Sequence, residues 1–206
     1  MDAGCGYGYG SEILAERDTS VIGVDISPEA IEYANKHYNR RNITFHQGDI
    51  TYFEFSEFGQ FDAITFFEVL EHVSKPSATL QNLRKALKDS GKLIISVPNA
   101  KNASKNNEHH INSYAPEDLE ELLISNGFEV KQKFGQYPLL GALAEIARTF
   151  TGYNSCTDKE SGRVPRIVDS IPGLPEIFSN LYESDFAVST GRTTYFVAGP
   201  EEKQVP

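Results

Sequence analysis

Glycines stand at every second position near the start of the chain, where a ligand could approach the backbone closely. Glycine has no Cβ atom, so such a run permits a tight turn and leaves room for a bound molecule. A helix is expected directly after it. The segment reads Asp2-Ala3-Gly4-Cys5-Gly6-Tyr7-Gly8-Tyr9-Gly10.

The spacing of these glycines separates three classes of ligand. A P-loop contains Gly-Lys-Ser/Thr, but the first lysine of the chain is Lys36, which argues against a triphosphate. A dinucleotide fingerprint requires Gly or Ala at its last position, where this chain has Tyr9 or Ser11. Asp-x-Gly-x-Gly-x-Gly is instead the pattern of S-adenosylmethionine sites. The alternative is an ordinary glycine-rich turn.

Two carboxylates follow at the ends of the next two predicted strands. Asp25 is placed to accept hydrogen bonds from ribose hydroxyls, and Asp49 from an exocyclic amine of adenine. Ile26 and Ile50 adjoin them and would press on the two faces of the base. Each aspartate alone is more often a turn or N-cap residue. Together, at successive strand ends, they indicate a nucleoside site.

The elements that must position these residues alternate between strand and helix. Such alternation indicates an α/β fold with a mostly parallel sheet covered on both faces, and ligands bind at the carboxyl ends of its strands. The helix over 77–88 is expected to end just before Gly91. Strands are predicted over 21–25, 43–47, 61–67, 92–97, 128–134 and 193–198, and helices over 29–38, 77–88 and 116–126.

Composition narrows the class of protein. The 206 residues include 19 Lys+Arg and 29 Asp+Glu, a net charge of −10, which disfavours nucleic acid as a partner. No apolar run approaches the ~18 residues of a membrane span, and no signal peptide is evident. Cys5 and Cys156 form neither a disulfide framework nor a zinc pattern. We expect one cytoplasmic domain.

From Asp2 to about Phe134 the chain resembles the class I S-adenosylmethionine-dependent methyltransferases, and most closely the ubiquinone-biosynthesis-type and related small-molecule group. The motifs are DAGCGYGYG, VIGVDISPEAIEYA, the GDI turn at 48–50, FDAITFFEVLEHV, GKLIISVPN and HINSYAPEDLEELLISNGFEV. The resemblance implies a three-layer Rossmann-like sheet ending in an antiparallel hairpin, with S-adenosylmethionine as cofactor. The cofactor-binding residues that it implies are Asp2, Gly4, Gly6, Gly8, Asp25, Ile26, Asp49, Ile50 and the backbone at Phe67.

The chain departs from that family at its beginning. Members carry a full first strand and a preceding helix, whereas here Met1 stands directly before Asp2. Either the sequence is part of a longer chain, or neighbouring elements compensate. We expect residues 1–206 alone to be marginally folded and to bind cofactor weakly, because the first strand normally lies at the centre of the sheet.

Histidines supply two candidate bases for transfer of a methyl group to a hydroxyl. Glu68, Glu71 and His72 are spaced i, i+3, i+4, so a helix would place them on one face. An unperturbed histidine titrates in the useful range, which makes His72 the first candidate; His110, in the loop after the strand ending at Val97, is the second. Alternatively, Glu71 is a solvated helix charge, His72 is a packed or capping histidine, and His110 is part of a polar surface loop.

The Glu-x-x-Glu-His pattern also resembles a magnesium site ascribed to some ubiquinone-type O-methyltransferases. Glu68, Glu71 and His72 would be its ligands. The same triplet occurs in relatives without a known metal, so no functional metal is expected.

Residues 135–193 form an insertion relative to the minimal fold, placed before the last strand. Leu139, Leu143, Ile146 and Phe150 recur at helical spacing. This helix could be a lid, a dimer contact or peripheral core. We therefore predict a single domain with a cofactor half (1–99) and an acceptor half (100–206).

The predicted reaction is methylation of a small-molecule acceptor, with oxygen favoured over nitrogen. The predicted partners do not include nucleic acid or a transmembrane anchor, and the oligomeric state is open. The alternatives are a non-catalytic module and another transferase or oxidoreductase on the same scaffold.

Overall fold

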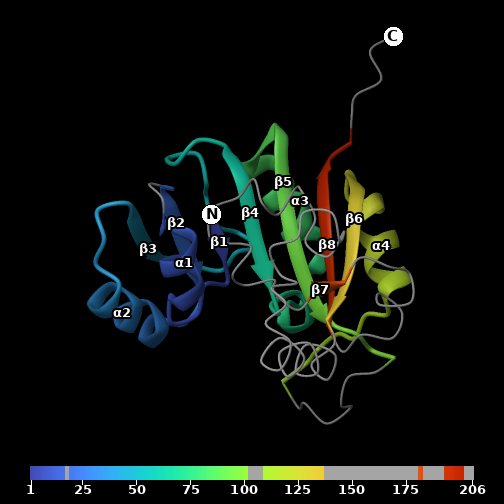
Figure 1. The fold of residues 1–206 in the computed structure, drawn as a ribbon, viewed down its shortest axis with the longest axis horizontal. Helices are drawn as coiled ribbons and strands as arrows, with labels where there is room; N and C mark the ends of the chain where they lie inside the picture. Colours follow the sequence, from blue (N-terminus) through green and yellow to red (C-terminus); the bar gives the residue numbers. More distant parts are fainter. Residues whose placement is uncertain (17–18, 102–108, 137–180, 183–192, 202–206) are drawn as a thin grey trace, which may run out of the picture.

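Eight strands form one sheet in the computed structural model, which describes residues 1–16, 19–101, 109–136, 181–182 and 193–201. Their order across the sheet is β3-β2-β1-β4-β5-β8-β6-β7 (Figure 1). The strands are β1 (Asp2–Ala3), β2 (Val21–Asp25), β3 (Ile43–Gln47), β4 (Phe61–Phe67), β5 (Leu87–Pro98), β6 (Phe128–Gln136), β7 (Leu181–Tyr182) and β8 (Thr193–Pro200). The helices are α1 (Tyr9–Leu14), α2 (Pro28–His37), α3 (Pro76–Ala86) and α4 (Pro116–Ser125), with a 3-10 helix, η2 (Leu70–His72).

The first five strands of the chain run parallel, and the last three pair antiparallel. β8 lies between β5 and β6, with Ile95 opposite Phe196 in one pair and Phe134 opposite Tyr195 in the other. This arrangement confirms the predicted α/β class, including the antiparallel end. β7 pairs with β6 and was not anticipated.

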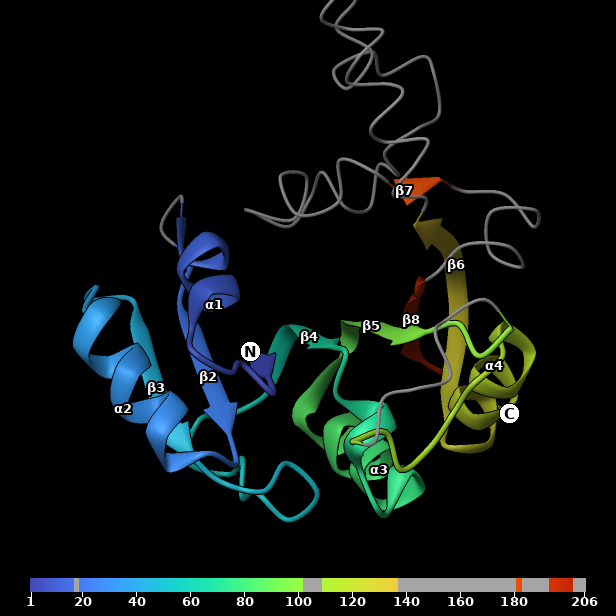
Figure 2. The ribbon, with the colours of Figure 1, turned by 90° about the horizontal axis from the view of Figure 1, so that it is seen from below.

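Helices cover both faces of the sheet, and the strands alternate accordingly. Leu93 and Ile95 of β5 pack with the cluster that includes Leu80 and Leu83 of α3. Ile94, between them in the sequence, belongs to the opposite cluster, which also holds residues of α1 and α2. Figure 2 shows α3 and α4 together on one face, with α1 on the other side. Each strand therefore supplies apolar side chains to two layers.

β1 is only two residues long, yet it lies at the centre of the sheet. Asp2 pairs with Gly23 of β2 and with Thr65 of β4. The Asp2 carboxylate is buried and accepts hydrogen bonds from Ser11 Oγ at 2.6 Å and from Thr65 Oγ1 at 2.8 Å. Burial raises the pKa of Asp2, while these two bonds favour its charged form. Asp2 thus links β1, α1 and β4.

A cavity of about 510 Å³ lies beyond Met1, between the amino-terminal parts of β2 and β4. Val21 and Ile22 line it on the β2 side, and Phe61 and Ala63 on the β4 side. The Met1 ammonium donates to the Ala63 carbonyl oxygen at 2.8 Å, and burial lowers its pKa to about 6. In this part of the sheet β2 and β4 have no strand between them among the described residues.

The end of α3 and the segment around Glu68 differ most from the sequence expectations. α3 ends at Ala86, and Leu87 and Lys88, expected in the helix, belong to β5, because Leu87 pairs with Phe61 of β4. Gly91 therefore lies inside a strand and does not cap the helix. The expected helix over Glu68, Glu71 and His72 is wrong: Glu68 has a positive φ of 54°, and only Leu70–His72 forms a short 3-10 turn.

The expected helix at 139–150 lies outside the described residues. None of the helices in the part of the chain described here has the length and apolarity needed to cross a membrane.

Candidate functional site

A cavity of about 200 Å³ opens at the carboxyl ends of β2 and β3. The larger cavity lies at the other end of these strands, beyond Met1. The smaller cavity brings together five of the residues expected to bind the cofactor. Another part of the wall comes from the segment after β4 and includes His72. The five are Gly4, Asp25, Ile26, Asp49 and Ile50.

Asp25 organises the glycine loop from the end of β2. Its Oδ2 accepts a hydrogen bond from the Gly6 amide at 2.8 Å, and its Oδ1 accepts from the Ser27 amide at 2.9 Å. Each carboxylate oxygen has a second lone pair, so both can still accept a bond from a ligand hydroxyl. Asp25 therefore fixes the loop and lines the cavity at once.

Gly4 and Gly8 adopt left-handed backbone conformations, with φ of 72° and 87°. At Gly4 a Cβ atom would lie 2.3 Å from Cγ2 of Val69, which follows the carboxyl end of β4. Two backbone bonds at 2.7 and 3.1 Å join the amides of Gly4 and Cys5 to the Val24 carbonyl. Gly4 thus allows the loop to pass close to the turn that follows β4, whereas Gly8 lies against Ala34 and Phe45.

Asp49 stands at the end of β3 and is exposed. Its Oδ1 accepts from the Thr51 amide at 2.9 Å, which shapes the turn. The neighbouring Ile50 is buried, whereas Ile26 is 67% exposed. An apolar side chain this exposed beside a cavity is suited to cover one face of a planar ligand.

Other expected cofactor residues occupy different places. Asp2 is committed to the interior of the sheet, and Gly6 and Gly8 shape the loop without lining the cavity. Phe67 ends β4 and its ring contacts Tyr195, with 6.1 Å between centroids. The cavity is lined instead by Val69, and by Val73 and Ser74, which sequence reasoning missed.

His72 lines this cavity and is 41% exposed. Its Nδ1 lies 2.9 Å from the carbonyl oxygen of His109. A carbonyl can only accept, so Nδ1 carries the proton and Nε2 of the neutral ring is left as an acceptor. The ring of His110 lies against it edge-on, with 4.9 Å between centroids. Burial and the two neighbouring histidines lower the pKa of His110.

Glu71 is almost fully buried next to these histidines, with 2% exposure. Burial raises the pKa of its carboxyl to about 7, and the charge of Glu68 adds to the rise. Its backbone carbonyl accepts from the amides of Ile111 and Asn112, both at 2.9 Å. These bonds hold the segment after residue 108 against η2.

The ligand set suggested by the sequence does not fit a metal. Glu68 lies ahead of the 3-10 turn, and its Oε1 accepts from Ser96 Oγ at 2.7 Å. Within the described residues, the ligand atoms that lie within 4.8 Å of one another belong to Glu71, His72 and His110. A magnesium site of Glu68, Glu71 and His72 is therefore not formed.

The family model and the relatives of known function that this chain resembles are all methyltransferases. A family model described as "Methyltransferase domain" matches residues 1–140. The ubiquinone biosynthesis O-methyltransferase of Idiomarina loihiensis is 37% identical over 48% of this chain and 42% of its own length. The mitochondrial enzyme of that name from Schizosaccharomyces pombe is 40% identical over 47% and 36%. The chain thus spans less than half the length of these relatives.

A solved structure extends the likeness to the whole fold. The TehB-like S-adenosylmethionine-dependent methyltransferase of Corynebacterium glutamicum superposes with a TM-score of 0.62. The match covers 97% of this chain and 78% of that chain at 17% identity. At this identity the likeness concerns the fold alone.

Proposed function

Since the chain belongs to the class I S-adenosylmethionine-dependent methyltransferases, we propose that it methylates an oxygen of a small-molecule acceptor. Family membership makes S-adenosylmethionine the cofactor, and the proposal assigns it to the cavity lined by Gly4, Asp25 and Asp49. Asp25 would hold the ribose, and Asp49 with Ile26 and Ile50 the adenine. Gly4 would lie against the methionine end.

The observation that carries the proposal is the position of His72 in the wall of that same cavity. When bound, S-adenosylmethionine supplies a methyl group already activated by its sulfonium. The protein's task is alignment and removal of a proton. As the acceptor oxygen bonds to the methyl carbon and the carbon–sulfur bond breaks, Nε2 of His72 takes the hydroxyl proton. Its lone pair is available because Nδ1–H is engaged by the His109 carbonyl.

Oxygen is favoured over nitrogen because the proposed base, His72, would serve a hydroxyl acceptor. A hydroxyl must lose its proton during transfer, whereas a neutral amine can attack with its own lone pair. His110 beside His72 is the second candidate base. The relatives named as ubiquinone O-methyltransferases support a small acceptor, and the net charge of −10 disfavours a nucleic acid. A cytoplasmic location is part of this proposal and rests on the low cysteine content.

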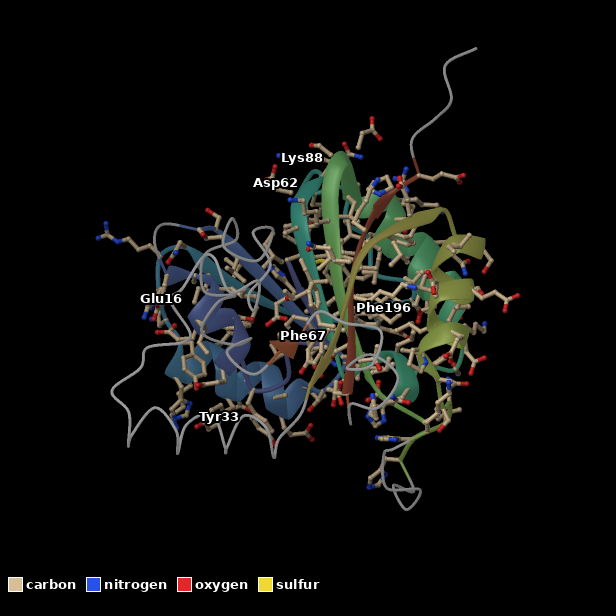
Figure 3. The ribbon with its side chains drawn as sticks, turned by 45° about the vertical axis from the view of Figure 1, so that its right-hand side comes forward. Glu16, Tyr33, Asp62, Phe67, Lys88 and Phe196 are labelled. Atoms are coloured by element: carbon tan, nitrogen blue, oxygen red, sulfur yellow. The ribbon has the colours of Figure 1, made fainter. Side chains whose placement is uncertain are left out.

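The cofactor assignment is tested by titration calorimetry. We expect S-adenosylmethionine to bind more tightly than NAD, and Asp25→Ala to weaken its binding by about 1–3 kcal/mol through loss of hydrogen bonds to a charged acceptor. Asp62→Ala is the matched control. Figure 3 shows Asp62 with Lys88, its partner at 2.7 Å, at the end of β4 away from Phe67. Tighter binding of NAD, or unchanged affinity in folded Asp25→Ala, would contradict the assignment.

The reaction is tested with labelled methyl donor and a panel of phenolic, alcoholic and amine acceptors, with RNA and DNA alongside. His72→Ala should lower the rate at saturating cofactor at least tenfold, since general-base catalysis contributes about 10²–10⁴-fold. His37→Ala, on the exposed surface of α2 where His37 stacks on Tyr33, should retain the rate. Methylation of nucleic acid without any small acceptor would overturn the proposal.

A further inference from the structure

We infer that Tyr52 and Lys75 are positioning residues for the adenine end of the cofactor, and that the hydrogen bond between them slows release of the bound nucleoside. The inference deepens the proposed function, because it rests on the assignment of S-adenosylmethionine to the cavity at the ends of β2 and β3. Neither side chain is part of the cavity wall that the described residues form. They would act through the residues directly before them, Thr51 and Ser74, which do line the cavity.

The turn after β3 carries the part of the cavity that is proposed to hold adenine. The Tyr52 amide donates to the Asp49 carbonyl oxygen at 2.9 Å, and the Thr51 amide donates to Asp49 Oδ1 at 2.9 Å. These two bonds shape the turn, but both lie within it. Contacts with another element are therefore needed to hold Asp49 and Ile50 in place relative to the rest of the cavity wall.

Two polar side chains of α3 hold the buried part of this turn. Asn82 Nδ2 donates to the carbonyl oxygens of Ile50 and Phe53, both at 3.0 Å. The buried hydroxyls of Thr51 and Thr79 lie 2.8 Å apart. Thr79 and Asn82 are three residues apart, so they share one face of α3. These contacts belong to the folded interior, and their loss would destabilise the protein as a whole.

The contact continues at the surface through Lys75, the N-cap residue of α3. Its Nζ donates to the Tyr52 hydroxyl at 2.7 Å and lies 5.4 Å from the centroid of the same ring. Both side chains are exposed, that of Tyr52 by 60%. The bond connects the residue after Thr51 with the residue after Ser74. It therefore joins two parts of the cavity wall from the outside.

The charge of Lys75 adds a weaker attraction between the same two segments. The hydrogen bond to Tyr52 raises the pKa of Lys75, and the negative charge of Asp49 contributes to the rise. The ammonium is thus charged at neutral pH and is attracted to the carboxylate of the turn. Because solvent screens this attraction between exposed groups, the hydrogen bond is the stronger of the two contributions.

An exposed pair of this kind adds little to the stability of the fold, because ordering two long side chains offsets the contact that they make. It influences ligand binding more strongly. Walls that are already ordered in the free protein lose less freedom when the ligand binds. Such differences in affinity appear mostly in the dissociation rate. An effect on binding without an effect on stability distinguishes the inferred role from a purely structural one.

The experiment measures the dissociation rate of S-adenosylhomocysteine by stopped-flow displacement. Tyr52→Phe and Lys75→Met should each raise this rate about three- to tenfold, the effect of one hydrogen bond. The double variant should show no further increase, because both changes remove the same bond. Lys75→Arg should keep the slow rate, since its guanidinium can also donate to the hydroxyl. Calorimetry with adenosine, which has only the nucleoside part, should show the same loss of affinity.

Tyr33→Phe and Lys88→Met are the matched controls. Tyr33 is an exposed tyrosine of α2, and Lys88 pairs with Asp62 in the amino-terminal part of β4. Both controls should leave the dissociation rate unchanged. Urea denaturation should give Tyr52→Phe and Lys75→Met the same unfolding midpoint as the original chain.

The outcomes distinguish this inference from the proposed function. An unchanged dissociation rate in Tyr52→Phe, where Asp25→Ala does weaken binding, would refute the inference and leave the cofactor assignment intact. Faster dissociation in Tyr52→Phe with unchanged affinity in Asp25→Ala would support the inference and refute the ribose contact. Additive effects in the double variant, or a lower unfolding midpoint in each single variant, would show that the hydrogen bond does not act as inferred.

Discussion

At the scale of single residues, Gly4 brings the glycine loop close to Val69 in the turn that follows β4. An added Cβ would meet Val69 at 2.3 Å, in a backbone conformation with φ of 72°. We expect Gly4→Ala to lower the free energy of unfolding by about 2–4 kcal/mol, through backbone strain and overpacking together. Urea denaturation measures this change.

Gly59→Ala separates the two contributions. Gly59 has nearly the same φ, 71°, but nothing lies within 4 Å of its added Cβ. It should cost only the strain, about 1 kcal/mol. Equal losses in the two variants would show that contact with Val69 does not matter.

Glu71 makes stability depend on pH. Its pKa is raised by burial to about 7 in the folded protein, above the ordinary value of 4.5. A carboxyl with a raised pKa favours folding below pH 4.5 and loses that contribution as the pH rises through 7. As the pH rises from 4.5 through 7, the free energy of unfolding of Glu71→Gln should therefore increase relative to that of the original chain, by about 2 kcal/mol.

Thermal or urea unfolding of both proteins at pH 4.5, 6 and 8 provides the measurement. A difference between the two free energies that stays constant with pH would show that the Glu71 carboxyl is not desolvated.

The sequence predicted the residues whose roles depend on local spacing. Gly4, Asp25 and Asp49 follow from the glycine motif and from strand ends, and they share one cavity. It did not predict that Val73 and Ser74 line the cavity, or that Glu71 is buried with His110 beside it. Those facts depend on the positive φ of Glu68 and on the loop that η2 binds, both of which require tertiary contacts.

At the scale of elements, α3 packs against the face of the sheet that it shares with α4. Leu80 and Leu83 are fully buried among residues of the parallel strands. Leu83→Ala should lower the free energy of unfolding by about 2–5 kcal/mol, since it leaves a cavity in a packed layer. Ile124→Ala on α4, where the side chain is 56% exposed, should change it by less than about 0.5 kcal/mol.

Chemical denaturation of the two variants tests this expectation. Similar losses at both positions would mean that α3 contributes little packing beyond its own helical structure.

The boundary between α3 and β5 shows where sequence reasoning at this scale fails. Leucines at 80, 83 and 87 recur at helical spacing, and this periodicity predicts a helix through Lys88. In the folded chain Leu87 pairs with Phe61, and β5 begins there. Pairing with a distant strand outweighs local periodicity, as is common at element ends. Long periodic segments such as α2 and α4 were predicted within one residue at each end.

At the scale of the whole molecule, a cavity separates the amino-terminal parts of β2 and β4. It is about 510 Å³ and is bounded by apolar side chains of both strands. We predict that residues 1–206 alone are marginally stable. An apolar strand-forming segment fused before Met1 should raise both the melting temperature and the affinity for S-adenosylmethionine. Each buried large apolar side chain contributes about 1.5–3 kcal/mol.

A fused Gly/Ser segment of equal length is the control, because it adds chain without apolar burial. Calorimetry of the three proteins measures both quantities. Cooperative unfolding of 1–206 at an ordinary mesophilic midpoint, with cofactor affinity equal to that of the extended chain, would show the prediction to be wrong.

The shortness of β1 also bears on how the molecule would respond to mechanical load. Among the described residues, Asp2 and Ala3 are the part of the sheet that pairs between β2 and β4. The smaller cavity is lined by residues from both sides of β1: Asp25 and Asp49 follow β2 and β3, and Val69 and His72 follow β4. A molecule bound there would contact both parts of the sheet and oppose their separation. Pulled apart, the ligand-free sheet would yield along this line first, and the bound ligand would carry part of the force.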